Sequence, residues 1–137
     1  MAVAVCYEKP TRFARYTVSS TGTIPKGTLL ALTSPNTVAA ASADNDVAGG
    51  IAWIEKDTAD STTEISAALN GVWGIPIGTA GGITTEFDAV HGAVAGNELK
   101  AYTTLDNEKG YVWGKSLEDV AVSTAAVAVV AKIRVNI

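Results

Sequence analysis

Residues 24–32 of the chain read Ile24-Pro25-Lys26-Gly27-Thr28-Leu29-Leu30-Ala31-Leu32. This apolar strand, which follows a tight Gly turn, leads into a polar turn at Ser34-Pro35-Asn36. The chain then returns through Val38 to Gly49-Gly50-Ile51-Ala52-Trp53. Short apolar runs bounded by Pro, Asn and Gly are typical of strands joined by tight turns. The segment therefore predicts a small β body built from hairpins.

A looser copy of the same order occurs later in the chain. It runs from Val94 to Tyr102, has a polar turn at 106–110, and continues through Trp113 to Asp119. We expect this copy to form a second hairpin of the same kind. Neither copy contains a side chain placed for chemistry, so the pattern is typical of a structural protein.

Alternating apolar residues predict further strands. In residues 63–69 the inward positions are Ile65, Ala67 and Leu69, and the Asn70-Gly71 pair that follows predicts a hairpin turn into residues 72–77.

The C-terminal segment has the clearest alternation in the chain. One face is apolar and the other is polar, as expected of a strand that closes a sheet. The apolar face holds Val127, Val129, Ala131, Ile133 and Val135, and the polar face holds Lys132, Arg134 and Asn136.

In two segments the sequence does not decide between strand and helix. Residues 83–94 allow one short helix with Thr84 or Thr85 as its N-cap and Gly92 as its end, and residues 116–122 allow one helical turn. Elsewhere, closely spaced Gly and Pro residues leave little room for long helices.

Composition limits the class of protein. The 137 residues suit one domain with its own core. Only 18% of residues are charged, against an average of about 25% in soluble domains, so we expect part of the surface to be covered by a partner. The net charge of −4, without a run of Lys or Arg, argues against nucleic-acid binding.

The sequence predicts no export signal and no membrane span. Residues 1–6 are apolar but lack a basic region, and the apolar run at 120–131 is shorter than the roughly 20 residues that a spanning helix needs. The single Cys6 cannot form a disulfide within the chain. We interpret it as a small apolar residue, with an intermolecular bridge as the alternative.

Residues 1–18 are predicted to form an extended N-terminal arm, followed by a β-rich domain at 19–137. Residues 12–18 predict a strand with Ala14, Tyr16 and Val18 on one face. The arm also carries two arginines and two aromatic residues, and we expect these to contact a partner or a neighbouring subunit. The equally weighted alternative is that the aromatic residues cover the domain's own core. The four residues are Arg12, Phe13, Arg15 and Tyr16.

No catalytic, metal or cofactor site is predicted. The one histidine, His91, has no nucleophile motif around it, and Cys6 with His91 cannot make a typical zinc site. The acidic segment 44–46 lacks calcium-loop spacing, and the Gly-rich segment 78–82 lacks the lysine of a phosphate-binding loop. We interpret both as turns, and Glu55, Asp57, Asp60 and Glu64 as a solvated acidic rim.

Three tryptophans stand out among small side chains. We favour a packing role for Trp53, Trp73 and Trp113, and the alternatives are contact with another subunit or partner, or a platform for a sugar ring.

The order of these elements resembles that of the capsid decoration, or capsid cement, proteins of tailed phages. The resemblance covers residues 20–137. It is carried by the Gly-turn strand at 24–32, the Ala-rich hairpin at 38–43, the segment Ala48-Gly49-Gly50-Ile51-Ala52, and Gly114-Lys115-Ser116-Leu117-Glu118-Asp119 before the terminal strand.

The resemblance implies a mainly β chain: a single compact β-sandwich or barrel-like (β-tulip-like) domain with an extended arm and at most one or two short helices. It implies a non-enzymatic homotrimer, assembled in the host cytoplasm, that binds the major capsid protein on the outside of an expanded HK97-type bacteriophage capsid. There it would cement the virion shell against internal DNA pressure. The alternatives are a surface-displayed carbohydrate-binding or adhesion module using Trp73 or Trp113, or a tail-associated structural protein.

Overall fold

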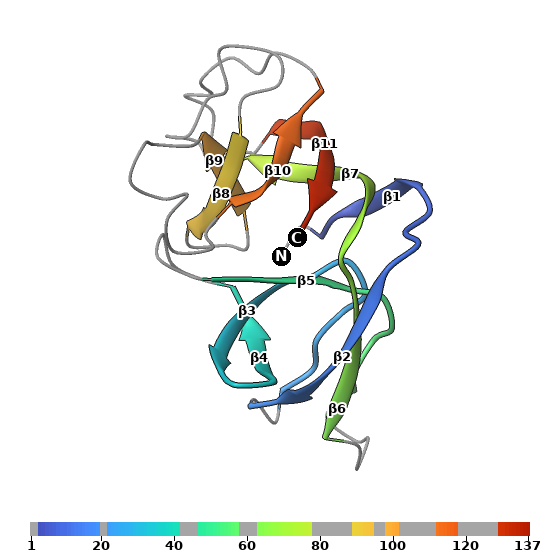
Figure 1. Cartoon of the computed structure of the whole chain (residues 1–137), viewed down its shortest axis with the longest axis vertical. Coiled ribbons are helices and arrows are strands. Elements are labelled where there is room, and N and C mark those ends of the chain that lie inside the picture. Colours follow the sequence, from blue (N-terminus) through green and yellow to red (C-terminus); the bar gives the residue numbers. More distant parts are fainter. Residues whose placement is uncertain are drawn as a thin grey trace.

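The chain folds into two β-structured parts, a closed barrel and a separate sheet, which pack on each other and are called its two layers below (Figure 1). The structure, a computed structural model, describes residues 3–19, 22–41, 47–57, 63–77, 89–94, 98–101, 112–117 and 129–137. Within these ranges the strands are β1 (Val5–Glu8), β2 (Phe13–Val18), β3 (Leu29–Ser34), β4 (Thr37–Ala40), β5 (Val47–Ala52), β6 (Glu64–Ala68), β7 (Asn70–Ile77), β8 (Ala89–Val94), β9 (Glu98–Ala101), β10 (Val112–Ser116) and β11 (Val129–Asn136). The prediction of a mainly β, barrel-like domain is confirmed.

The first layer is a closed barrel with the strand order β2-β4-β3-β5-β6. β3 and β4 form the predicted hairpin around Pro35 and Asn36, and Asn36 adopts the left-handed conformation with φ of 56°. Asn tolerates this conformation well, which explains its place in the turn. In β2, Ala14, Tyr16 and Val18 are less exposed than their neighbours, as predicted.

The second layer is a six-stranded sheet with the order β1-β7-β11-β10-β8-β9. β7 also pairs in parallel with β9 through Ile77 and Leu99, so the sheet curls back on itself. β11 pairs with β7 along its whole length. Its residues Ala131, Ile133 and Val135 are buried whereas the residues between them are exposed, which confirms the predicted alternation.

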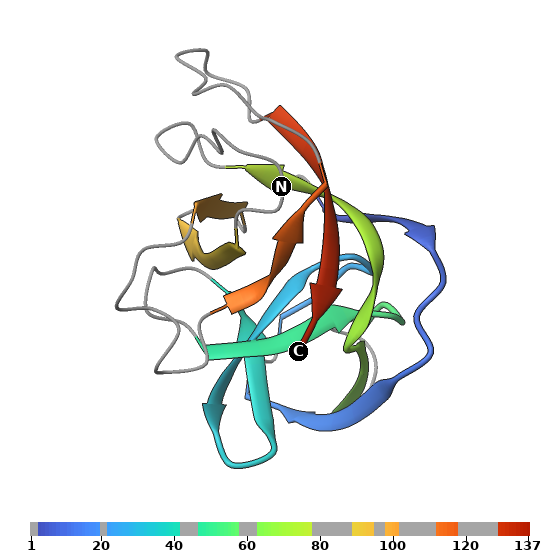
Figure 2. The ribbon, with the colours of Figure 1, turned by 45° about the horizontal axis from the view of Figure 1, so that its top comes forward.

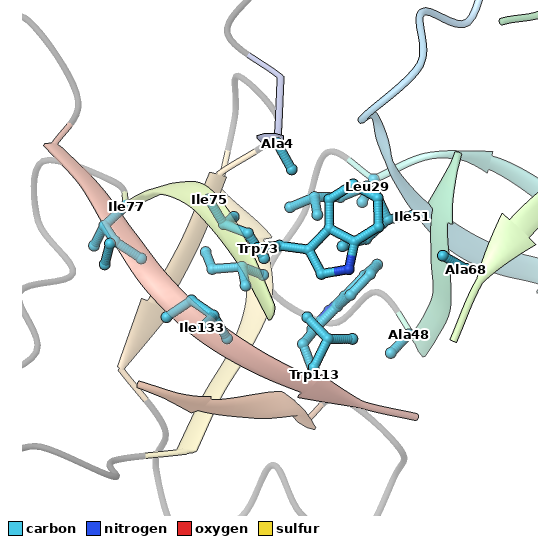
Figure 3. Packing of buried hydrophobic residues seen from close by; sticks show 14 of the residues in the cluster. Ala4, Leu29, Ala48, Ile51, Ala68, Trp73, Ile75, Ile77, Trp113 and Ile133 are labelled. Atoms are coloured by element: carbon cyan, nitrogen blue, oxygen red, sulfur yellow. The ribbon is translucent and has the colours of Figure 1, made fainter. Parts of the chain in front are cut away.

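Two apolar clusters stabilise these layers. One fills the barrel and includes Leu30, Val38 and Ile65. The other lies between barrel and sheet, where Leu29 and Ile51 meet side chains of the sheet, including Trp73 and Trp113 (Figure 3). Because successive residues of a strand point to opposite sides, Leu29 and Leu30 serve different clusters. Residues 29–31 of β3 and residues 48–52 of β5 are therefore buried on both faces of the barrel wall.

The predicted hairpin at Asn70-Gly71 is wrong. β6 belongs to the barrel and β7 to the sheet, and the two strands pair with different partners. Gly71 has φ of 108°, and a Cβ there would lie 2.7 Å from the carbonyl oxygen of Glu8. Asn70 and Gly71 are instead the first two residues of β7, paired with Asn136 and Val135, at the point where the chain passes from the barrel to the sheet.

The second predicted hairpin is also wrong. β9 and β10, which flank its turn, both pair with β8 and not with each other. Ala89 and Val90 lie in strand β8, so the short helix allowed over 83–94 does not include them. The predicted features at 44–46, Asp60, 78–88, 106–110, 118–122 and Val127 lie outside the described residues.

Candidate partner-contact surface

The N-terminal segment contributes one strand to each layer. β1 pairs with β7, with Val5 opposite Gly74 and Cys6 opposite Trp73, whereas β2 pairs with β6 and β4 in the barrel. The amide of Ala4 also donates a hydrogen bond of 2.8 Å to the carbonyl of Gly27. The structure thus places residues 3–18 on the body of the domain, along both the sheet and the barrel (Figure 2).

The four residues proposed for partner contact do not form one patch. Phe13 and Arg15 point outward from β2, while Tyr16 points inward and packs against the barrel cluster. Burial raises the pKa of the Tyr16 phenol above its ordinary value. Arg15 lies 2.8 Å from Glu64, in an ion pair whose side chains are both more than half exposed. Such a pair adds little stability.

Arg12 ties the N-terminal segment to the end of the chain. Its Nη2 donates hydrogen bonds to Asn136 Oδ1 at 2.7 Å and to the carbonyl of Ile137 at 3.0 Å. Asn70 Oδ1 accepts from the amides of Thr11, at 2.8 Å, and Arg12, at 3.1 Å, and Asn70 Nδ2 donates to Thr11 Oγ1 at 2.8 Å. Arg12 and Asn70 therefore link the connection between β1 and β2 to the connection between β6 and β7, and at both connections the chain passes between sheet and barrel.

The three tryptophans occupy different depths. Trp73 and Trp113 are 0% exposed and belong to the cluster between the layers, so their rings have no face to offer a sugar or a partner. Trp53 is partly buried. Its ring lies 5.6 Å from that of Phe13 and 6.1 Å from that of Trp73, both edge to face, and Lys26 Nζ lies 4.4 Å from its centroid. A ladder of aromatic rings thus runs from the core to the surface at Phe13.

The indole nitrogens of the two buried tryptophans differ. Trp73 Nε1 donates a hydrogen bond of 3.1 Å to the carbonyl of Asn70. Trp113 Nε1 is buried and has no hydrogen-bond partner among the described residues. An unpaired buried donor costs stability.

The outer face of the sheet carries exposed apolar side chains that the sequence analysis missed. Val5, Tyr7 and Val130 are 57%, 56% and 52% exposed. The Tyr7 ring lies over Gly74, since a Cβ at that position would be 2.7 Å from Tyr7 Cε2 and 3.2 Å from Val130 Cγ1. Lys132 Nζ lies 5.1 Å from the centroid of the same ring. The alternation of Val5 and Tyr7 is visible in the sequence, but their neighbours follow only from the pairing of β1 with β7.

A shallow depression of about 330 Å³ opens beside these residues. It is lined by Glu8, Lys9, Asn70, Arg134 and Asn136, among others, and Glu8 lies 3.6 Å from Arg134. The lining of the depression therefore includes two cations, two side-chain amides and one carboxylate.

The residues considered for chemistry are not brought together. Cys6 is partly buried, its Sγ donates to the carbonyl of Glu8 at 3.3 Å, and desolvation raises the pKa of its thiol. A raised pKa keeps the thiol protonated and less reactive. The backbone of His91 lies on β8, opposite Lys100 and Val112. Within the described ranges, no three His, Cys, Asp or Glu side chains gather where they could hold a metal ion.

No protein-family model matches the sequence, and none of the curated proteins matches it either. In the described part of the chain, no helix has the length and apolar character needed to cross a membrane.

Proposed function

We propose that this chain is a structural virion protein that binds the outer surface of an expanded HK97-type capsid and cements the shell against internal DNA pressure. The observation that carries the proposal is the group of large apolar side chains on the outer face of the sheet, Val5, Tyr7 and Val130, each more than half exposed. Contiguous exposed apolar residues mark protein–protein contact sites. The resemblance of residues 20–137 to capsid decoration proteins indicates which partner to test.

The two-layer body suits such a role. Its barrel and its sheet share one apolar cluster, so a contact made by the sheet is backed by a rigid core. A cement protein needs only a modest contact at each site, because many copies together oppose opening of the lattice. We propose that the contact uses outward side chains of β1 and β11, and that the protein acts as a homotrimer together with the major capsid protein.

The proposal is tested by co-sedimentation of the purified protein with expanded capsids that lack it and with unexpanded procapsids of the same virus. Saturable binding to expanded shells alone is expected. Val130→Ser should weaken this binding, whereas Ile54→Ser, which changes a 59% exposed residue outside the sheet, should not. Absence of wild-type binding to both shells would contradict the proposal and favour a tail-associated or adhesion role.

A sugar platform built on Trp73 or Trp113 is not proposed. Stacking on a sugar needs an accessible ring face, and both rings are fully buried.

A further inference from the structure

Basic side chains gather on the same outer face as the exposed apolar ones. Residues that are paired directly across neighbouring strands point to the same side of a sheet. Arg134 on β11 is paired with Lys115 on β10, and both side chains are exposed. Lys132 lies two residues before Arg134 on the same face, opposite Gly74. Lys9 follows β1 and lines the depression together with Arg134.

This concentration of positive charge contrasts with the rest of the chain. The four cations Lys9, Lys115, Lys132 and Arg134 belong to a chain with ten Lys and Arg residues and a net charge of −4. The four strands β1, β7, β10 and β11 carry a single carboxylate, Glu8. Its pair with Arg134 is 3.6 Å long, with both side chains at least 60% exposed, so it neutralises little.

The arrangement costs stability in the isolated chain. Like charges directly opposite each other on a sheet repel, as Lys115 and Arg134 do. Among the described residues, Lys9 and Lys115 form no ion pair that would offset this repulsion. A partner that brings carboxylates to this face would remove the repulsion.

We propose that this outer face binds an acidic protein surface. Carboxylates of the partner sit in the depression between Lys9 and Arg134 and beside Lys115, and an apolar side chain of the partner packs on Tyr7 and Val130. The inference rests on the proposed function and names the chemistry of the shell surface that the protein contacts. The apolar half of the face favours protein over nucleic acid, because the side chains of Val5, Tyr7 and Val130 offer nothing to a phosphate backbone.

The first experiment compares two double variants in the co-sedimentation assay. Lys9→Glu with Lys115→Glu reverses two cations of this face that make no ion pair within the described structure. Arg15→Glu with Lys26→Glu makes the same change in net charge at two residues that do not line the depression. We expect the first variant to bind about tenfold or more weakly and the second to bind like wild type. Raising the salt to about 0.5 M should weaken wild-type binding. Equal binding by the two variants would overturn the inference.

A second experiment works without capsids. A fluorescent peptide of alternating Glu and Leu, and a labelled DNA duplex of equal charge, are titrated with wild type and with the variant carrying both Lys9→Glu and Lys115→Glu. Binding of the peptide that the double variant loses supports the inference, even if capsid binding fails and the proposed function falls. Tighter binding of DNA than of the peptide, or binding of neither, would overturn it.

Discussion

Replacing each buried tryptophan with phenylalanine separates the contribution of a hydrogen bond from that of packing. Trp73 and Trp113 are both 0% exposed and lie in the same cluster, so Trp73→Phe and Trp113→Phe remove the same atoms from the same kind of environment. The loss of buried area and the space left behind therefore nearly cancel when the two variants are compared. The two side chains differ at Nε1, which is hydrogen-bonded in Trp73 and unpaired in Trp113 within the described structure.

The difference in stability follows from these two nitrogens. Trp73→Phe loses a hydrogen bond with a net value of about 1 kcal/mol, whereas Trp113→Phe removes an unpaired buried donor whose desolvation costs about 2 kcal/mol. We therefore expect the free energy of unfolding to be about 3 kcal/mol lower for Trp73→Phe than for Trp113→Phe. With a urea m-value of about 1.5 kcal/mol/M, the unfolding midpoints should differ by about 2 M.

The assay is urea unfolding followed by circular dichroism, so that the loss of an indole does not change the probe. Equal m-values in the two variants are the control, because they show that the same surface is exposed on unfolding. Equal midpoints, or a lower midpoint for Trp113→Phe, would refute the assignment of the unpaired donor to Trp113.

Three further predictions concern individual residues. Asn70→Ala should lower the free energy of unfolding by about 1.5 kcal/mol, because three solvent-exposed hydrogen bonds are lost, and Asn70→Asp should restore part of it by keeping the two that Oδ1 accepts; urea titration measures both. Gly71→Ala should cost more than about 1 kcal/mol, since φ is 108° and a Cβ would meet the Glu8 carbonyl; a melting temperature equal to wild type would contradict this. The raised pKa of Tyr16 stabilises the fold below the ordinary phenol pKa, and this stability is lost as the pH rises through the folded pKa; Tyr16→Phe should therefore flatten the fall in stability above about pH 10.

The local sequence pattern was sufficient to predict the structure where a strand buries one face or where a turn needs a particular residue type. The alternation at 131–136 predicted which side chains of β11 are buried, and Pro35-Asn36 predicted the hairpin between β3 and β4. In both cases the information lies within a few neighbouring residues, because side-chain direction and turn geometry are local properties.

Pairing between strands could not be read in the same way. Asn70-Gly71 has the chemistry of a hairpin turn, yet β6 and β7 enter different layers, because the partners of each strand are set by distant residues. The exposed apolar group proposed as a contact surface was missed for the same reason. Val130 lies more than 120 residues after Val5 and Tyr7 along the chain, and the three residues meet because β1 and β11 both pair with β7.

The division of strands between the layers has a consequence for fragments of the chain. Residues 13–68 supply all five strands of the barrel, and residues 70–136 supply five of the six strands of the sheet, while β1 reaches back from the first part to the second. Two polypeptides separated at Leu69 would each hold a nearly complete hydrogen-bonded layer and an uncovered half of the shared cluster. Such fragments should associate without a covalent link, because β1 of the first fragment pairs with β7 of the second. Fused to two other proteins, the fragments would then report when those proteins come close together.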